Sequence, residues 1–361
     1  MKSICFIAQF PPPIHGLSKA VDTLYHSNLN KKYDFRPINI TSNKKILHTL
    51  WEIWKGKSDL YYFTISQTKG GNLRDLLILF LLRLKGGKCL IHLHGGYYRQ
   101  LIEKDCNEWQ RKLNYKALKH INGAIVLGKS LKPIFRGMIE EEKIFTVPNC
   151  IDNQYTLPEQ TFRTKLSTIK TCPKVHILYL SNFIPSKGYK EVLALANIAK
   201  KQQSKQIHFH FAGIFFDPKE EAFFHEYIKK NGLENYVTYH GVVTGKEKQN
   251  LLALCHVFIL LTRYPKEGQP ISILEAMGNG LVIITTNHAG IPDIVQNQVN
   301  GMVVDKEHIQ LDTIFQYIST LIDDRELLSD ISCKNYDIAT TSYTEENYIK
   351  NMDNVFSKIL Q

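Results

Sequence analysis

The sequence predicts an α/β protein built from doubly wound parallel sheets, and three observations support this prediction. Short β-branched or aromatic runs alternate with longer stretches of helical periodicity. The alternation stops in a polar stretch at residues 152–173 and then starts again. The chain has 361 residues, enough for two cores at about 100–200 residues per domain. We therefore expect two domains facing a common cleft, with ligands beyond the carboxyl ends of their strands.

Two series of apolar runs have the composition of buried strands. The first series covers residues 3–10, 60–65, 89–94, 124–127 and 144–147. The second covers residues 175–181, 207–214, 237–240, 257–261 and 282–285. They place one domain at residues 1–165 and another at residues 166–340. Residues 341–361 carry apolar side chains at helical spacing and predict a terminal amphipathic helix.

The composition is that of a folded protein. A hydrophobic fraction of 43% excludes a disordered chain, and ordinary glycine and proline contents exclude collagen-like and low-complexity classes. The seven cysteines are widely spaced, form no C-x-x-C pair and follow no secretory leader. A reducing cytosol is therefore the expected compartment.

The longest apolar run, residues 76–82, is far shorter than the roughly 20 residues that a membrane span requires. We interpret it as a helix buried on one face against a sheet. A helix that dips into a membrane surface is the alternative.

The net charge of +11 is distributed unevenly along the chain. Residues 1–150 contain 24 Lys and Arg against 11 Asp and Glu, whereas the remainder contains 21 against 23. Nucleic acid, anionic lipid and phosphorylated ligands all attract such an excess. The asymmetry indicates that one domain faces something anionic.

One phosphate-loop pattern requires an alternative interpretation. Residues 123–130 satisfy G-x-x-x-x-G-K-[ST], which taken literally indicates an NTPase. The four intervening residues are apolar and largely β-branched, and a helical stretch precedes them, so we favour a strand end and a helix start. The absence of G-x-G-x-x-G after the first strand disfavours an NAD-dependent dehydrogenase, and the absence of G-x-S-x-G disfavours an α/β-hydrolase.

Two loops in the first half combine glycine with a strand end or a helix start. Gly16 follows a proline-rich turn just before a helical stretch, where backbone N–H groups are free for a ligand. His94 ends a strand beside Gly95 and Gly96, so we predict that it faces a ligand. We interpret His92 as a packing residue of the same strand.

The second half offers a cation in one loop and two carboxylates farther on, Glu267 in a Gly-Pro loop and Glu275 one to two turns into the following helix. Lys187, in a strand-to-helix loop, can neutralise a diphosphate, although a solvated lysine is the alternative. With Pro270 near a helix start, Gln269 and its neighbours present N–H groups suited to sugar hydroxyls or phosphate. Glu275 lies among apolar neighbours and can accept two hydrogen bonds from a ribose.

These residues resemble the retaining GT-B-fold enzymes called glycosyl transferases group 1, or glycosyltransferase family four. Glu267 and Glu275 stand as the E-x7-E motif of that family, and the likeness extends along most of the chain. The other matching segments are His15-Gly16, His94-Gly95-Gly96, and residues 147–152, 185–188, 209–213, 239–243, 281–283, 290–292 and 300–301.

The resemblance implies two Rossmann-like domains, with the terminal helix crossing back toward the first. It implies that a hexosyl or N-acetylhexosaminyl group moves from a nucleotide-sugar, UDP-sugar favoured over GDP-sugar, to a saccharide acceptor with retention of configuration. The acceptor is expected to be lipid-linked, in capsule, O-antigen or related bacterial polysaccharide synthesis. The basic acceptor half would then face an anionic membrane surface, peripherally on its cytoplasmic side, and no nucleic acid is expected as a partner.

The resemblance also assigns roles to individual residues. Those expected to act in catalysis are Glu267, His94 and Lys187. Those expected to bind the donor are Gly16, Asn182, Lys187, Val243, Gly268, Gln269, Pro270, Ile271 and Glu275. No cofactor or metal is expected, because the chain contains no D-x-D sequence.

Two positions depart from the family pattern. Asn182 stands where an arginine is common five residues before the lysine, and Gln269 stands where a bulky aromatic residue is frequent. Asparagine carries no charge, so the departure implies lower activity, another compensating cation or a different donor. A catalytically silent GT-B subunit that binds nucleotide is the alternative that Asn182 leaves open.

Overall fold

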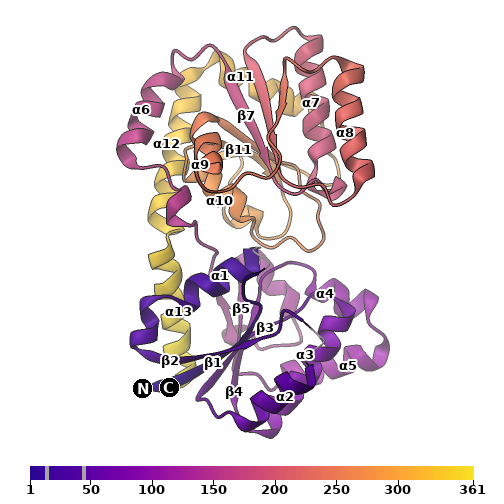
Figure 1. Ribbon diagram of the computed structural model, residues 1–361, viewed down its shortest axis with the longest axis vertical. Helices are drawn as coiled ribbons and strands as arrows, with labels where there is room; N and C mark the ends of the chain where they lie inside the picture. Colours follow the sequence, from indigo (N-terminus) through magenta and orange to yellow (C-terminus); the bar gives the residue numbers. More distant parts are fainter. Residues whose placement is uncertain (13–15, 43–45) are drawn as a thin grey trace. The chain divides into compact units, whose positions relative to one another are not determined.

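The computed structural model describes residues 1–12, 16–42 and 46–361 as two compact units (Figure 1). The first unit contains residues 1–150, 266–269 and 345–361, and the second contains residues 151–265 and 270–344. The boundaries placed from sequence at residues 165 and 340 fall inside two helices of the second unit, α6 (Glu159–Ile169) and α12 (Arg325–Ser342).

The first unit has a six-stranded sheet in the order β2-β1-β3-β4-β5-β6, with every pair parallel. Its strands are β1 (Lys2–Ala8), β2 (Tyr33–Asn39), β3 (Leu60–Thr64), β4 (Lys88–Leu93), β5 (Gly123–Val126) and β6 (Ile144–Thr146). One face packs against α1 (Gly16–Tyr25) and α13 (Glu345–Leu360), which share a core with it. The other face is covered by α2 (Ile46–Lys55), α3 (Lys69–Leu84) and α5 (Glu108–Leu118) (Figure 1).

Short helical turns connect the elements of the first unit. They are α4 (Tyr98–Gln100), the π-helix η3 (Leu101–Asp105) and the 3₁₀ helices η1 (Asn28–Lys31), η4 (Lys129–Phe135) and η5 (Glu141–Lys143). Residues 123–130 therefore form strand β5, a connection and the start of η4, as the strand interpretation of this segment expects.

The second unit has another six-stranded parallel sheet, in the order β12-β11-β10-β7-β8-β9. Its strands are β7 (Val175–Leu180), β8 (Ile207–Ala212), β9 (Val237–Tyr239), β10 (Val257–Leu260), β11 (Val282–Thr286) and β12 (Gly301–Val304). Its helices are α6 (Glu159–Ile169), α7 (Tyr189–Lys201), α8 (Pro218–Asn231), α9 (Gly245–Leu254), α10 (Ile271–Met277), α11 (Leu311–Asp323) and α12 (Arg325–Ser342), with 3₁₀ helices η6 (Asn153–Tyr155), η7 (Pro185–Lys187) and η8 (Ile291–Asp293).

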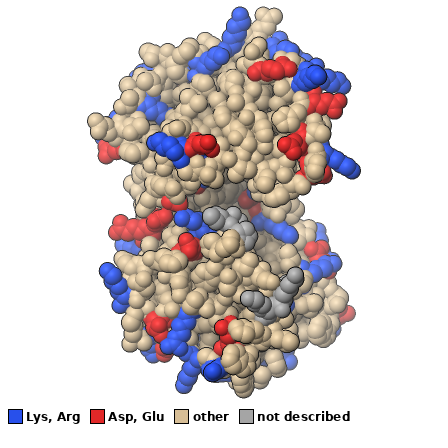
Figure 2. Space-filling view, viewed as in Figure 1, with Lys and Arg blue, Asp and Glu red and all other residues tan. Residues whose placement is uncertain are grey.

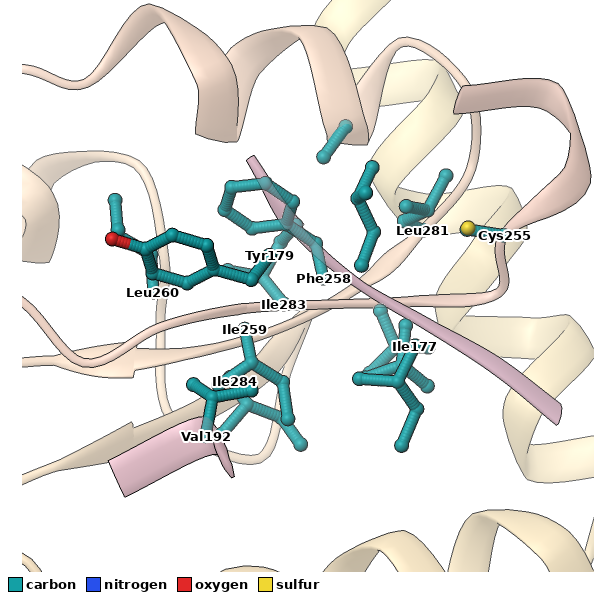
Figure 3. Packing of buried hydrophobic residues seen from close by; sticks show 14 of the residues in the cluster. Ile177, Tyr179, Val192, Cys255, Phe258, Ile259, Leu260, Leu281, Ile283 and Ile284 are labelled. Atoms are coloured by element: carbon teal, nitrogen blue, oxygen red, sulfur yellow. The ribbon is translucent and has the colours of Figure 1, made fainter. Parts of the chain in front are cut away.

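The core of the second unit lies on both faces of the central strands. Ile177, Phe258 and Ile283 come from three neighbouring strands, and all three side chains are fully buried (Figure 3). Burial on both faces explains why these strands are almost continuously apolar. The predicted fold class, an α/β protein with two parallel sheets, is confirmed.

The sequence-based strands missed β2 and β12, each of which forms one edge of its sheet, although the opposite edge strands, β6 and β9, were predicted. β2 contains Asp34, Arg36 and Pro37, and edge strands carry charges and proline because one side has no hydrogen-bonding partner. In α3 the run at residues 76–82 is helical, and Leu76, Leu79 and Leu82 are buried. Within the described residues, no helix combines the length and hydrophobicity needed to cross a membrane.

A strip of imidazoles crosses one side of the second sheet. His176 Nδ1 lies 2.8 Å from His210 Nε2, and His210 Nδ1 lies 2.9 Å from His240 Nε2. His256 sits beside them and its ring accepts a hydrogen bond from the His176 amide. Burial lowers the pKa of all four rings and of His208, and lowers those of His210 and His256 to about 3. The strip is therefore uncharged at neutral pH.

We expect stability to fall as the pH drops below about 6.5. The histidine pKa values are lower in the folded chain than in the unfolded chain, so the unfolded state takes up more protons on acidification. Between pH 7.5 and pH 5, His210 and His256 should each cost about 2 kcal/mol of unfolding free energy. Urea unfolding of His210→Gln/His256→Gln should show a shallower loss over this range. His225→Gln, which changes an exposed histidine of α8, is the control and should keep the wild-type slope.

Candidate functional site

The loops after β7 and β10 lie at the point where the strand order of the second sheet reverses. β7 pairs with β8 on one side and with β10 on the other, which is where ligands bind in open parallel sheets. Gly188 ends the β7 loop in a left-handed conformation, with φ of 82°. A Cβ atom there would lie 2.3 Å from the carbonyl oxygen of Leu261, so only glycine permits this close approach.

Two cations converge at the start of α7. The Lys187 ammonium lies 4.9 Å from the ring centroid of Tyr264. The Arg263 amide donates to the carbonyl of Ser186 at 2.6 Å, and its guanidinium forms an ion pair with Glu191. Because Glu191 is in the first turn of α7, the guanidinium lies at the N-terminal end of that helix. Two cations, one carboxylate and a helix N-terminus form a cradle for an anionic group.

Asn182 lies in the same loop, with its side chain exposed and its carbonyl accepting a hydrogen bond from the Tyr179 hydroxyl at 3.0 Å.

Sequence reasoning missed Arg263. Only the strand order reveals it, because residues that follow β10 lie beside residues that follow β7. One oxygen of Glu191, Oε2, is buried and has no hydrogen-bond partner among the described residues. The cradle therefore contains an acceptor able to receive a further donor.

Glu275 is buried on α10 and is already paired. Its Oε1 lies 2.6 Å from Lys248 Nζ of α9, and only 4% of the residue is exposed. Lys248 in turn lies 4.0 Å from the ring centroid of Tyr155. The Tyr155 hydroxyl accepts a hydrogen bond from the Gly245 amide at 3.2 Å, and Asn279 donates to the Tyr155 carbonyl at 2.6 Å. Lys248 and Tyr155 were not singled out from the sequence, since neither belongs to a local motif.

The remaining predicted donor residues of the second unit border this cluster. Val243 is half-buried against the core, two residues before Gly245. Pro270 is buried at the N-cap of α10, and Ile271 is the first residue of that helix. The structure thus brings Val243 to the same neighbourhood of α9 as Lys248, and places Pro270 and Ile271 on the helix that carries Glu275.

His94 lies in the first unit, just beyond the end of β4, and stacks on His92. The two ring centroids are 3.8 Å apart. His92 is fully buried and its Nδ1 lies 2.7 Å from the Tyr62 hydroxyl. Burial, followed by the influence of His94, holds the pKa of His92 well below its usual range, so its ring is neutral. His92 therefore supports His94 from the core without adding charge.

Residues 266–269 belong to the first unit by their contacts, although their neighbours on both sides belong to the second. A Cβ atom on Gly268 would lie 2.7 Å from the His94 carbonyl oxygen, and one on Gly95 would lie 2.6 Å from the Lys266 carbonyl oxygen. The two backbones are thus in direct contact, and Glu267 is buried beside them with 8% exposure. The structure therefore brings Glu267 and Gly268 to the His94 end of β4.

The side chain of Gln269 is occupied by contacts within the first unit. Its Oε1 accepts from the Asn149 amide at 2.7 Å, and its Nε2 donates to the Leu127 carbonyl at 3.3 Å. Asn149 also donates to the Gln269 carbonyl at 3.0 Å. These bonds tie the loop to the segment at residues 147–152. Gly16, the other predicted residue of this unit, is exposed at the first position of α1, and His15 lies outside the described residues.

Comparison with solved structures identifies the architecture. The crystal structure of Anabaena Alr3699/HepE in complex with UDP matches with a TM-score of 0.75 at 14% identity, covering 99% of this chain and 100% of that one. Because the identity is low, this likeness shows the fold alone. The predicted GT-B fold, with two Rossmann-like parallel sheets, is confirmed.

Residues 167–337 match the sequence profile described as Glycosyl transferases group 1. Apart from residues 266–269, the match lies within the second unit, and it confirms the family resemblance that the sequence motifs indicated.

Two relatives accompany the family match. An uncharacterized 41.2 kDa protein in the cps region of Klebsiella pneumoniae is 25% identical over 68% of this chain and 74% of that protein. A GDP-mannose-dependent alpha-(1-6)-phosphatidylinositol monomannoside mannosyltransferase of Mycobacterium tuberculosis is 26% identical over 50% of this chain. The chain matches about half, 47%, of the length of that mannosyltransferase.

We expect Gly188→Ala to destabilise the second unit more than Gly241→Ala. Both glycines have a left-handed φ, of 82° and 66°, but a Cβ on Gly241 meets nothing within 4 Å. The left-handed conformation should cost about 1–2 kcal/mol at either position. Only Gly188→Ala adds the clash with Leu261, so thermal denaturation should show the larger decrease in melting temperature for this variant. Equal decreases would contradict the close approach of the two loops.

Proposed function

We propose that the protein is a retaining, metal-independent glycosyltransferase that transfers a sugar from a nucleotide-sugar to a lipid-linked saccharide. The observation that supports this most directly is the pair of cations, Lys187 and Arg263, at the start of α7 in a unit of the group 1 family. A nucleoside diphosphate is the leaving group of such a reaction, and it carries the negative charge that this cradle is built to receive.

The proposed chemistry is a substitution at the anomeric carbon of the donor. The bond from that carbon to the diphosphate oxygen breaks, and a bond to an acceptor hydroxyl oxygen forms on the same face of the sugar. The hydroxyl proton leaves with the departing diphosphate. Lys187, Arg263 and the N–H groups of α7 stabilise the growing charge on the diphosphate, and preorganised charge of this kind is usually the largest catalytic contribution.

We assign the other predicted residues to the two ends of the donor. The ribose hydroxyls donate hydrogen bonds to the Glu275 carboxylate. To do so, they replace part of the contact between Lys248 and that carboxylate. Val243, or backbone near it, lines the base. His94, Glu267 and Gly268, which the first unit brings together, act on the transferred sugar, with Gly16 and the backbone of Gln269, Pro270 and Ile271 as further donors of hydrogen bonds. Asn182 contributes a neutral hydrogen bond.

The donor we favour is a UDP-sugar carrying a hexose or N-acetylhexosamine. The matching HepE structure contains UDP, whereas the mycobacterial relative is named for GDP-mannose, so a GDP-sugar is the competing donor. For the acceptor, one relative is encoded in a cps region and the other acts on a phosphatidylinositol mannoside. These names support a role in capsule or related polysaccharide synthesis, with the basic first unit at the cytoplasmic face of a membrane.

We expect Lys187→Ala and Glu275→Gln each to reduce sugar transfer about 100- to 1000-fold, because each removes a group that contacts the donor. UDP or GDP, but not ATP with Mg²⁺, should raise the melting temperature of the wild type, and less so that of either variant. Lys201→Ala, at the opposite end of α7, is the matched control and should behave as wild type.

A wild type that binds the diphosphate but transfers no sugar from any nucleotide-sugar would support the silent-subunit alternative. The exposed, uncharged Asn182 is the observation that favours that alternative. Full transfer activity in Lys187→Ala would refute the proposed site.

We expect Arg263 to supply the charge that Asn182 lacks. The double variant Arg263→Ala/Glu191→Gln removes the ion pair as a whole, leaving no unpaired carboxylate, and should lower transfer about tenfold or more through loss of a charged donor. Adding Asn182→Arg to this variant should restore part of the activity by returning a guanidinium to the loop. Kinetics of the three proteins test this, and an unchanged rate in the double variant would place Arg263 outside the site.

A further inference from the structure

The outer surface of the α2, α3 and α5 layer exposes an unusual number of large apolar side chains. These three helices lie side by side on one face of the first sheet (Figure 1). The exposed residues, here called the outer apolar face, are Leu47, Trp51 and Trp54 of α2, Leu73, Leu77, Phe80 and Leu84 of α3, and Trp109 of α5. All three tryptophans of the chain are in this set.

The four α3 residues form a continuous stripe along the helix. Their spacing of three to four residues places them on one side, opposite Ile78 and Leu82, which are buried. Phe80 is 61% exposed and Trp109 is 63% exposed. A groove of about 480 Å³ runs between α3 and α5, lined by Leu77, Phe80 and Trp109 among other apolar side chains. Folding of the unit accounts for the buried side of α3 but gives no reason for the exposed side.

Among the described residues, exposed basic side chains outnumber exposed carboxylates around this face. Exposed basic side chains surround it, namely Lys55, Lys57, Arg83, Lys116 and Lys119. The Lys55 ammonium lies 5.0 Å from the Trp51 ring centroid, and Arg83 and Lys116 border the groove. Two of the carboxylates on these helices have a cationic partner, since Asp75 pairs with Arg74 and Glu108 pairs with Lys112, and Glu52 lies beside His48. Figure 2 shows basic and acidic side chains interspersed over the visible surface of the unit that carries the N-terminus.

We infer that the outer apolar face binds an anionic lipid bilayer, with its tryptophans, leucines and Phe80 inserted below the headgroups. Tryptophan and leucine beside lysine and arginine are the residues of interfacial helices, because the rings enter the boundary while the cations meet anionic headgroups. The charge complementarity selects a bilayer over a second copy of this chain, since two such faces would bring like charges together. The inference deepens the proposed function, on which it rests for its lipid-linked acceptor.

Vesicle binding tests this inference directly. Vesicles of phosphatidylcholine mixed with phosphatidylglycerol should sediment with the protein and shift its tryptophan emission to shorter wavelength, since every tryptophan is on this face. Vesicles of phosphatidylcholine alone should bind weakly, and added salt should weaken binding to the vesicles that contain phosphatidylglycerol.

The variant Trp51→Ser/Trp54→Ser/Phe80→Ser should lose about tenfold or more in vesicle affinity. The control variant Phe216→Ser/Val242→Ser removes exposed apolar residues of the second unit and should bind as wild type.

Three results would overturn the inference. One is the absence of binding and emission shift with anionic vesicles, and another is wild-type affinity in the triple variant. The third is a dimer seen by light scattering that disappears in the triple variant while vesicles remain unbound, which would assign the face to a second copy. Donor hydrolysis measured on the same preparations without vesicles separates the two proposals: activity without vesicle binding overturns only this inference, whereas vesicle binding without activity overturns only the enzyme assignment.

Discussion

The parallel pairing of β7 with β10 is the constraint on which the candidate donor site depends. The pairing puts the loops after both strands at the carboxyl end of the sheet. Because Gly188 has no side chain, its backbone can contact the Leu261 carbonyl. Lys187 and Arg263 are therefore brought together by strand order and backbone contact, although 76 positions of sequence separate them. Two cations so placed repel each other, and Glu191 offsets part of that repulsion. The remaining positive charge can be compensated by an anionic ligand.

The two glutamates of the E-x7-E motif show how little sequence spacing alone says about geometry. Glu267 lies in the four residues that the contacts assign to the first unit, whereas Glu275 lies in the second. Two features hold residues 266–269 in the first unit. Gly268 packs against the His94 carbonyl, which leaves no room for a side chain, and Gln269 forms hydrogen bonds with Asn149 and Leu127. A glutamine here, where the family often has an aromatic residue, thus has a local structural reason: its carboxamide satisfies two backbone groups.

Interior strands of the fold were predictable from the sequence, whereas the edge strands β2 and β12 and the nonlocal contacts were not. Central strands such as β10 are buried on both faces and show as apolar runs, but β2 mixes charged residues with proline and gave no such signal. Lys187 and Glu275 stood out because each lies in a local motif. Lys248 and Arg263 did not stand out, because the partner of each is distant in sequence. Lys248 pairs with Glu275, and Arg263 pairs with Glu191, only once the chain has folded. Local patterns cannot reveal such pairs without the strand order.

The uneven charge of the chain takes on a more specific meaning once α3 is seen in place. The basic excess lies in residues 1–150, yet the cradle for an anionic group is in the second unit, where acidic residues slightly outnumber basic ones. A diphosphate site needs only a few positioned groups, so it does not account for that excess. The helix α3 is apolar around most of its circumference, a property of helices that are buried or lie in a membrane boundary. Since one side is buried on the sheet and the other is exposed, the excess charge and the exposed stripe have a common explanation in an anionic lipid surface.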